Sequence, residues 1–332
     1  MLRGIVSALL VACLLSGCGR PDEPVFRDRF YALGTLIDLS LYGANPEQQL
    51  EASEALALTF NTMHTDWHAW EAGRLAQTNT LLAGGRPFRP EADILALLQA
   101  ANRLSLQSGG LFNPTIGKLI DLWGFHADEI TVLTPPDPTA IQELLALAPS
   151  AADVVLEDGQ LVSRNPAVQY DLGAFAKGYA IDRGIELLQS LGIAHAIINA
   201  GGDLRAIGRH GDRPWRIGIR HPRQAGVLAS VELSEDESIF TSGDYERFFE
   251  ASGQRYHHII DPRTGYPSTG AMSATVIAPS AEFADALATA LCVMGPDAGL
   301  PLIESLPRVE AILVAMDGDV HATSGLHGDV VE

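Results

Sequence analysis

Cysteine is rare in this sequence, with three residues in a chain of 332. Cys13 and Cys18 lie near the start of the chain, and Cys292 is the only cysteine in the remainder. One thiol cannot form an internal disulfide, so a disulfide-stabilised fold is excluded for the part of the sequence after Cys18. Stability must come from a packed core, which a chain of this length with 47% hydrophobic residues can form.

Basic residues are also scarce. Lys and Arg number 22 against 41 Asp and Glu, which gives a formal net charge of −19. Proteins that bind nucleic acids gather Lys and Arg to contact phosphates, so this balance excludes nucleic acid as an expected partner. No run of like charge is long enough to form an interaction tail, and the acidic excess favours solubility.

Several common catalytic motifs are absent. No G-x-x-x-x-G-K-[ST] is present, because GGLFNPTIGK has the wrong spacing and Leu119 stands where Ser or Thr is required. No G-x-G-x-x-G, H-E-x-x-H, paired zinc-binding cysteines or G-x-S-x-G occurs either. Nucleotide binding by a P-loop or Rossmann fold, zinc hydrolysis and α/β-hydrolase chemistry are therefore unsupported.

The first residues indicate export. Arg3 precedes an apolar run, and MLRGIVSALLVACLLSGC ends in LSGC, which resembles the bacterial lipobox. We predict a signal peptide over residues 1–17, lipidation of Cys18 and a lipidated tether over 18–28. A plain signal peptide with an incidental Cys18 is the alternative. The expected product is a lipoprotein anchored in a membrane and facing the periplasm. No second long apolar run follows.

Hydrophobic periodicity predicts a mixture of helices and strands. Helices are expected at 46–63, 91–107, 138–148, 174–191 and 281–294. Strands are expected within 26–42, as a pair or one long strand, and at 153–156, 168–172, 194–199, 203–208, 215–219, 227–233, 257–260, 272–277 and 311–314. This order predicts an α+β fold in which helices pack on a largely antiparallel sheet.

Two charged residues in YDLGAFAKGYAIDRG (170–184) attract attention, because the rest of the segment suits burial. Asp171 is expected where a strand meets Gly173, and Lys177 in the first turns of the following helix. Unpaired amides and the positive dipole at a helix N-terminus favour phosphate, and Lys177 adds a positive charge. The alternative is a helix-capping Asp with a solvent-exposed Lys.

A second polar pair lies in ADALATA (284–290). Asp285 and Thr289 are four residues apart, so they share one face of the predicted helix. A carboxylate and a hydroxyl are the hard oxygen ligands that Mg²⁺ prefers, with phosphate and water completing its shell. The alternative is an Asp near a helix N-terminus and a Thr bonded back to its own helix.

Two further segments remain ambiguous. His257 and His258 precede an apolar pair, and on a strand they point to opposite faces, so at most one faces a given pocket. That one could act as a base near a phosphoryl group or be a hydrogen-bonded core residue. Gly201 and Gly202 permit either close approach of the backbone to a ligand or a tight turn.

Seven segments occur in the order found in one protein family. They are ALGT (32–35), GGLFNPTIGKLIDLWGF (109–125), DLGAFAKGYAIDR (171–183), INAGGDL (198–204), TSGDYERFFE (241–250), HIIDPRTGYP (258–267) and ADALATALCVMG (284–295). The set resembles the ApbE family, the FAD:protein FMN transferases, and extends from about residue 30 to residue 325. It implies a single ApbE-like catalytic domain, which we place at residues 29–328.

The resemblance implies a reaction. Members of the family cleave the pyrophosphate of FAD with Mg²⁺ and transfer FMN through a phosphoester to a Thr or Ser of a target protein, releasing AMP. Their targets include extracytoplasmic redox subunits of the Rnf and Na⁺-pumping quinone reductase complexes. The nucleophile then lies in the partner, which agrees with the missing nucleophile motif. An FAD pyrophosphatase that yields FMN and AMP, and a non-enzymatic lipid-tethered flavin carrier, are the alternatives.

The same resemblance implies site residues, position by position. The expected flavin-nucleotide contacts are Leu33, Trp70, Leu111, Phe112, Asn113, Asp171, Lys177 and Ile259. The expected Mg²⁺ ligands are Ala174 through its backbone carbonyl, Asp285 and Thr289. The expected catalytic residues are His258, which matches a histidine discussed as a base, and Lys177.

The sequence departs from the family pattern at four of its positions. Leu33 replaces the usual Met and keeps its bulk. Asn113 replaces a frequent Asp, and Ala288 stands where a further carboxylate is sometimes found. Trp70, in WHAWEAGRLAQTN (67–79), is matched to the family's stacking aromatic only across an alignment gap. We therefore expect the metal to depend more on Thr289 and on ligand phosphates.

Overall fold

The structure is a computed structural model that describes residues 25–127, 129–233, 236–326 and 328–330. The predicted signal peptide, residues 1–17, and the lipidated Cys18 lie outside the described residues. The first strand, β1, spans Phe26–Ala32, so residues 26–28, the end of the predicted tether, already form part of the sheet. A search of the described residues for an apolar helix of membrane-spanning length finds no candidate.

Eight of the described strands form one sheet with the order β1-β2-β5-β6-β9-β12-β13-β14. The strands that follow β1 are β2 (Thr35–Leu41), β5 (Ala196–Ala200), β6 (Asp203–Ile207), β9 (Glu237–Gly243), β12 (Ser273–Ala278), β13 (Glu310–Val314) and β14 (Val320–Ala322). Every neighbouring pair is antiparallel. The prediction of an α+β fold with a largely antiparallel sheet is confirmed.

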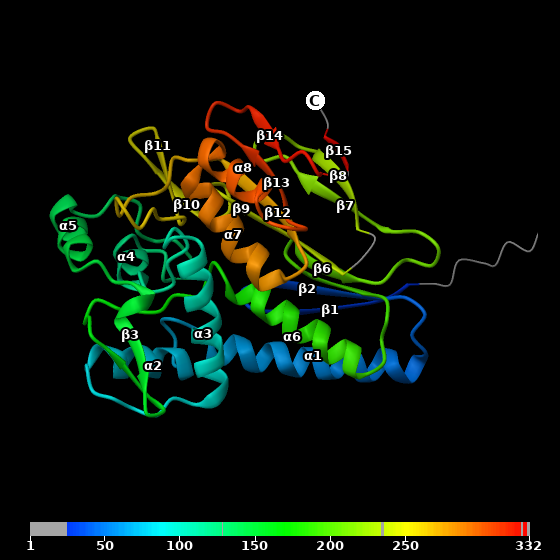
Figure 1. The fold of residues 1–332 in the computed structure, drawn as a ribbon, viewed down its shortest axis with the longest axis horizontal. Helices are drawn as coiled ribbons and strands as arrows, with labels where there is room; N and C mark the ends of the chain where they lie inside the picture. The colour runs from blue at the N-terminus through cyan, green and yellow to red at the C-terminus, as the bar shows by residue number, and fades with distance from the viewer. Residues whose placement is uncertain (1–24, 128, 234–235, 327, 331–332) are drawn as a thin grey trace, which may run out of the picture.

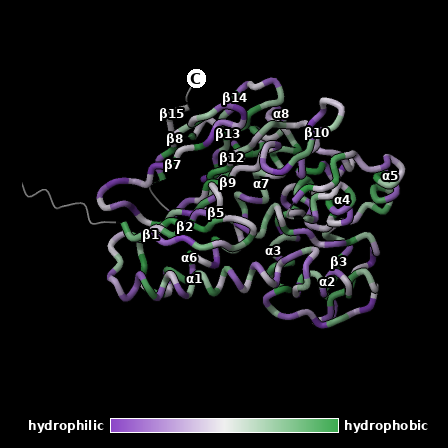
Figure 2. Tube along the Cα trace, turned by 180° about the vertical axis from the view of Figure 1, so that it is seen from behind, coloured by the Kyte–Doolittle hydropathy of each residue, from purple (hydrophilic) through white to green (hydrophobic). Residues whose placement is uncertain are grey.

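Helices cover one face of this sheet (Figure 1). They are α1 (Pro46–Asp66), α6 (Ala176–Ser190), α7 (Ala281–Met294) and α8 (Pro296–Glu304). Along α1 hydrophilic and hydrophobic residues alternate (Figure 2), and Ala52, Leu56 and Phe60 form its buried side. Because strand side chains alternate between faces, Phe240 of β9 enters the core beneath these helices, whereas Ile239 enters the core on the opposite face.

A smaller sheet covers that opposite face. It has the order β15-β8-β7, with β7 (Trp215–Arg220), β8 (Val227–Leu233) and β15 (Gly328–Val330). Trp215, Leu228 and Val231 of this sheet pack against Ile239 and Ile312 of the main sheet. The main sheet is therefore covered by helices on one side and by strands on the other.

The remaining elements pack beside the helical layer, on the left in Figure 1. They are α2 (Arg74–Ala83), α3 (Ala92–Gln107), α4 (Gly117–Leu122), α5 (Pro138–Leu147), the 3₁₀ helix η1 (Ala151–Asp153) and the hairpins β3 (Val154–Glu157) with β4 (Gln160–Ser163) and β10 (Phe248–Ala251) with β11 (Gln254–His257). Phe112, Tyr170 and Phe175 join α2 and α3 to α7 in one hydrophobic cluster. This cluster fixes the chain between Tyr170 and α6, where the polar residues lie.

Two predicted strands are wrong. Of residues 257–260, only His257 belongs to a strand, as the last residue of β11, because the chain bends at His258 and Ile260 makes one isolated bridge with Pro267. Residues 168–172 do not form a strand, apart from one isolated bridge between Gln169 and Ile116. The segment is paired by backbone and by a side chain. The Gln169 and Asp171 amides donate to carbonyls of residues 114–115 at 3.1 and 2.8 Å, and the Gln169 carbonyl accepts from the amide of residue 117 at 2.8 Å. Between them, the Asn79 side-chain amide donates to the Tyr170 carbonyl at 2.9 Å and its oxygen accepts from the Tyr170 amide at 2.8 Å.

Candidate active site

The N-terminus of α6 brings the predicted residues together. The chain turns at Asp171, whose Oδ1 accepts from the Gly173 amide at 2.8 Å, and α6 then begins at Ala176. Lys177 is the second residue of the helix, as its prediction in the first turns requires. The positive end of the α6 dipole therefore lies within two turns of Lys177 and Asp171.

Lys177 is not a solvent-exposed lysine. Its Nζ forms an ion pair with Oδ2 of Asp203, the first residue of β6, and its side chain is 32% exposed. Burial alone would lower the pKa of Lys177, but the negative charges of Asp203 and Asp285 raise it above its ordinary value. Lys177 is therefore a fixed positive charge at neutral pH, and the alternative of a merely exposed lysine is excluded.

Asp285 meets α6 where α6 and α7 cross. Its Oδ2 accepts from the amide of Gly178, the third residue of α6, at 2.9 Å. The contact requires glycine, because a Cβ at position 178 would lie 2.3 Å from the Ala281 carbonyl oxygen and 2.8 Å from Cβ of Asp285. The carboxylate of one helix thus caps the other and lies beside Lys177.

These contacts fit a divalent cation. Burial, together with the charge of Asp203, raises the pKa of Asp285 to about 7 despite the opposing charge of Lys177, so the carboxylate lacks full compensation. Such a buried acid is stabilised in its charged form when a cation binds. Thr289 lies one turn further along α7, and its hydroxyl is 2.9 Å from that of Ser242 on β9.

Ala174 precedes α6 by two residues, and its role as a metal ligand through its carbonyl stays a prediction. The amide four residues further on, that of Gly178, donates to Asp285 and not to the Ala174 carbonyl. The described residues contain no group of three or more His, Cys, Asp or Glu able to hold a metal. A metal here would therefore depend on a carboxylate, a hydroxyl, a carbonyl and oxygens from its ligand, which is a donor set typical of Mg²⁺.

Asp171 forms part of a second group of contacts. Its Oδ2 lies 2.7 Å from Nε2 of His126, and the His126 ring stacks on Trp70 with 5.0 Å between centroids and 23° between planes. Burial alone would raise the pKa of Asp171, but the hydrogen bond and charge of His126 outweigh it, so the pKa lies below its ordinary value. Asp171 is therefore an ionised carboxylate with both oxygens already hydrogen-bonded within the protein.

His258 is close to these groups. Burial, followed by the charges of His257 and Arg247, lowers the pKa of His258 to about 3. Its Nδ1 lies 3.3 Å from the Arg247 carbonyl oxygen, which places the ring proton on Nδ1 and leaves Nε2 as the acceptor. His257, in contrast, is buried with Nε2 3.0 Å from the Ser268 carbonyl oxygen. The two imidazoles thus have different surroundings, as expected for adjacent residues on an extended chain.

The remaining predicted contacts lie deeper or are engaged elsewhere. Leu33 sits in the β1–β2 turn with φ 51° and, like Leu111, packs against the core that contains Ile259. Phe112 is 2% exposed. The Asn113 amide donates to the Pro149 carbonyl at 2.9 Å, and its oxygen accepts from the Thr115 amide and hydroxyl. Asn113 therefore already uses both ends of its side chain.

Several polar residues of this region were not predicted. Asp203 was obscured by the Gly pair before it, which forms a tight turn between β5 and β6 with φ 68° at Gly201 and 113° at Gly202. The turn interpretation of that pair is confirmed. Three others are close to quoted motifs but were not selected as site residues. His126 directly follows the segment 109–125, and Ser242 and Arg247 lie within the segment 241–250. Asp203 could have been found by searching for the carboxylate that pairs with Lys177, because a partly buried lysine requires an acidic partner.

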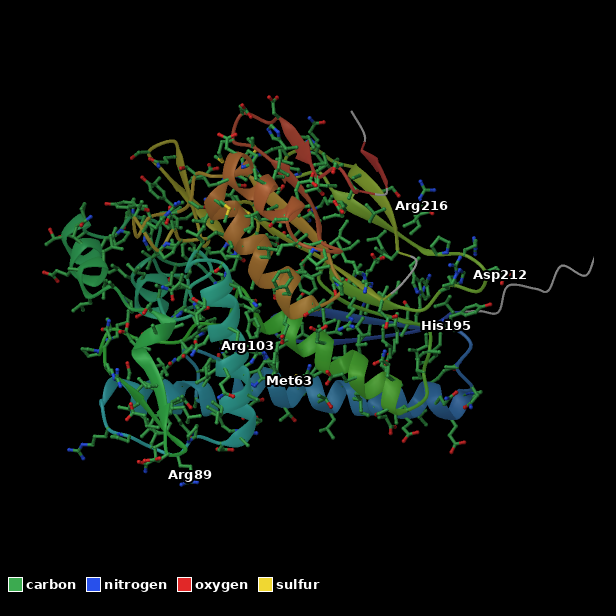
Figure 3. All side chains as sticks on the ribbon, viewed as in Figure 1. Met63, Arg89, Arg103, His195, Asp212 and Arg216 are labelled. Atoms are coloured by element: carbon green, nitrogen blue, oxygen red, sulfur yellow. The ribbon has the colours of Figure 1, made fainter. Side chains whose placement is uncertain are left out.

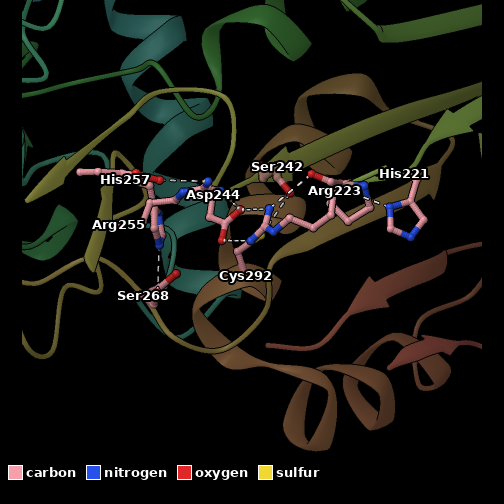
Figure 4. A network of polar contacts seen from close by, with 10 residues as sticks. His221, Arg223, Ser242, Asp244, Arg255, His257, Ser268 and Cys292 are labelled. Atoms are coloured by element: carbon pink, nitrogen blue, oxygen red, sulfur yellow. Dashed lines mark hydrogen bonds and ion pairs between the residues drawn. The ribbon is translucent and has the colours of Figure 1, made fainter. Parts of the chain in front are cut away.

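An ion pair with a buried carboxylate adjoins the site at the end of β9 (Figure 4). Arg223 donates to both carboxylate oxygens of Asp244, at 2.7 and 2.5 Å, and Asp244 is 3% exposed. Cys292 of α7 donates to the Ser242 carbonyl at 3.3 Å. The Cys292 contact therefore joins α7 to β9 beside Thr289, whereas the Arg223–Asp244 pair joins the connection between β7 and β8 to the end of β9.

A cavity of about 220 Å³ lies on the other side of α7. Its walls are mostly apolar and include Leu104, Phe283, Leu287, Leu302 and Leu306. It contains none of the predicted site residues. The predicted site residues therefore lie in the polar cluster at the N-terminus of α6 and not at this cavity.

Comparison with known proteins identifies the family of this chain. A family model described as the ApbE family matches residues 33–313. A Rhodobacter capsulatus protein named FAD:protein FMN transferase is 41% identical over 324 residues, covering 95% of this chain and 61% of that protein. One of the same name from Treponema pallidum (strain Nichols) is 34% identical over 343 residues, covering 96% and 93%.

Solved structures extend the similarity to the fold. The ApbE protein of Thermotoga maritima has a TM-score of 0.82 and 32% identity, covering 91% of this chain and 97% of that one. The flavin transferase ApbE from Vibrio cholerae has a TM-score of 0.77 and 27% identity, covering 91% and 98%. The resemblance read from seven sequence segments is confirmed, and the chain belongs to the ApbE family.

Proposed function

We propose that this protein transfers FMN from FAD to a Thr or Ser hydroxyl of a target protein and releases AMP. The observation that carries the proposal is the charge arrangement at the N-terminus of α6, where Lys177 lies between Asp203 and Asp285. Fixed positive charge, helix amides and a cation-binding carboxylate together suit a pyrophosphate. The names of the relatives support the same reaction, although the chain spans only 61% of the Rhodobacter capsulatus protein.

Mg²⁺ is the metal that we propose for this site, held by the Asp285 carboxylate, the Thr289 hydroxyl and the Ala174 carbonyl. When bound, Mg²⁺ supplies charge neutralisation to the pyrophosphate of FAD. The chain contributes the rest of the binding. Lys177 adds a positive charge because it stays protonated at neutral pH, and the positive end of the α6 dipole lies beside it.

The transfer reaction needs no nucleophile from this chain, because the hydroxyl of the target protein attacks the phosphorus. The acceptor oxygen bonds to the phosphorus of the FMN half, the bond from that phosphorus to the bridging oxygen breaks, and AMP leaves with the bridging oxygen. The hydroxyl proton must be removed. His258 is neutral at pH 7, because its pKa is about 3, and its Nε2 can accept a hydrogen bond. Such a weak base takes the proton only as the new phosphorus–oxygen bond forms.

The cellular setting is also a proposal, and it rests on the sequence. The LSGC segment supports an exported lipoprotein, anchored through Cys18 and facing the periplasm. There the protein would meet extracytoplasmic redox proteins, such as Rnf or Na⁺-pumping quinone reductase subunits, which supply the acceptor hydroxyl. Metabolic labelling with palmitate tests the anchor, because Cys18→Ser should abolish incorporation.

The reaction is tested by incubating the protein with FAD, Mg²⁺ and an acceptor domain that a known family member modifies. We expect acceptor that carries FMN, and AMP in equal amount. Free FMN with AMP and an unmodified acceptor would indicate an FAD pyrophosphatase instead. Bound FAD without AMP would indicate a flavin carrier. Asp285→Ala should abolish turnover under either enzymatic interpretation.

A further inference from the structure

His126 occupies a position that its sequence context did not predict. It follows α4, and its side chain is only 2% exposed. Its Nε2 lies 2.7 Å from Oδ2 of Asp171, and its Nδ1 lies 3.7 Å from Oδ1 of Asp121, whose side chain is 68% exposed. A buried imidazole that donates to a buried carboxylate fixes the orientation of both groups.

The other contact of His126 is with Trp70. The two rings stack with centroids 5.0 Å apart and planes 23° apart, and Trp70 remains 38% exposed. One face of the indole is therefore supported by His126, and the His68 ring meets the indole edge-on with 4.8 Å between centroids, while part of the residue stays exposed. Large exposed aromatic rings are uncommon without a partner, and a supported flat ring suits stacking by another flat ring.

The loop that carries His126 is held on both sides. Phe125 is 1% exposed and its ring meets that of His258 edge-on, with 6.4 Å between centroids. The Arg247 guanidinium donates to the Ala127 carbonyl. Residues 125–127 thus join the predicted flavin contacts to the segment that carries His258.

We propose that His126 is a positioning residue for FAD binding. It holds the Asp171 carboxylate and the Trp70 indole in one arrangement, so that a planar ring of the flavin nucleotide stacks on Trp70 while the carboxylate faces the same ligand. This inference rests on the proposed function, since it names how the same site holds its donor. His126 itself does not touch the reacting phosphorus.

Two variants separate its two contacts. His126→Phe keeps an aromatic ring against Trp70 but loses the donor to Asp171, and His126→Gln keeps a donor but loses the ring. We expect each to raise the Kd and KM for FAD by about tenfold, with kcat at saturating FAD within about twofold of wild type. In an Asp171→Asn background, His126→Phe should have little further effect, because the hydrogen bond is already weakened.

The control is His195→Phe, at the opposite end of the molecule (Figure 3), which should leave FAD binding unchanged. Melting temperatures identify variants that fail to fold, and the Gln variant then carries the test. Unchanged Kd in folded variants, or a fall in kcat at unchanged KM, would overturn the role of His126 while leaving the proposed function intact. If wild type binds no FAD, the proposed function and this inference fail together.

Discussion

The crossing of α6 and α7 allows a quantitative test at Gly178. A Cβ added there would lie 2.3 Å from the Ala281 carbonyl oxygen, whereas ordinary contacts begin at 3.4 Å. Both partners are helix backbone, so the helices must separate by about 1 Å to accept Gly178→Ala. The bond from the Gly178 amide to Asp285, now 2.9 Å, would then exceed hydrogen-bonding distance.

The loss of unfolding free energy caused by this separation is the sum of three contributions. Overpacking costs about 1–3 kcal/mol, and losing a hydrogen bond to a buried carboxylate costs about 1.5–3 kcal/mol. Replacing glycine by alanine within a helix returns about 1 kcal/mol. We expect Gly178→Ala to lose about 1.5–5 kcal/mol of unfolding free energy, and a 1 Å displacement of Asp285 relative to Lys177 to lower kcat/KM by about 100-fold.

Gly184→Ala is the matched control, because it lies on the same helix. Its Cβ would meet only the ends of flexible side chains, Ile198 and Leu56 at 2.8 and 2.9 Å and Phe60 at 2.9 Å. This variant should lose stability but keep its transfer rate. Urea unfolding and transfer kinetics measure both effects. Wild-type stability and kcat/KM in Gly178→Ala would refute the reasoning.

Three other predictions concern the charges of the site. Asp203→Asn should lower kcat/KM by about 10- to 100-fold, because Lys177 loses the partner that orients it; unchanged kinetics would show that Lys177 is held otherwise. Thr289→Val should weaken Mg²⁺ binding by about tenfold, measured as the Mg²⁺ concentration for half-maximal activity, with Ser242→Ala as a comparison. His258 has a folded pKa of about 3 against an ordinary 6.5, so the unfolded chain binds its proton preferentially. Its contribution to stability is complete above pH 6.5 and falls toward pH 3, by at most about 1.4 kcal/mol per pH unit. Chemical unfolding between pH 7 and pH 4 should therefore show a weaker pH dependence for His258→Asn than for wild type, and equal slopes would contradict the burial of His258.

Elements with strong periodicity were predictable from the sequence, and contacts between distant segments were not. The repeat of apolar residues defined α3 and α7, so Asp285 and Thr289 were correctly placed on one helix face. Residues 168–172 have the composition of a strand, yet the backbone of Tyr170 bonds to the Asn79 side chain, and its neighbours bond to the loop at 114–117. No local pattern shows that a side chain 91 residues away will do so.

The same limit applies to the site. Lys177 and Asp171 stood out because each is a single charge among small residues. Their partners, Asp203 and His126, lie 26 and 45 residues away and belong to segments with ordinary explanations of their own. Ala174 illustrates the opposite case, since a backbone carbonyl has no sequence signal, and only the resemblance to a family pointed to it.

The most direct test of the account is the mass of an acceptor domain after incubation with this protein, FAD and Mg²⁺, measured together with AMP. The account predicts that one Thr or Ser gains FMN as a phosphoester, that AMP appears in equal amount, and that Asp285→Ala produces neither. An acceptor of unchanged mass, in an assay where a known family member modifies it, would contradict the central claim.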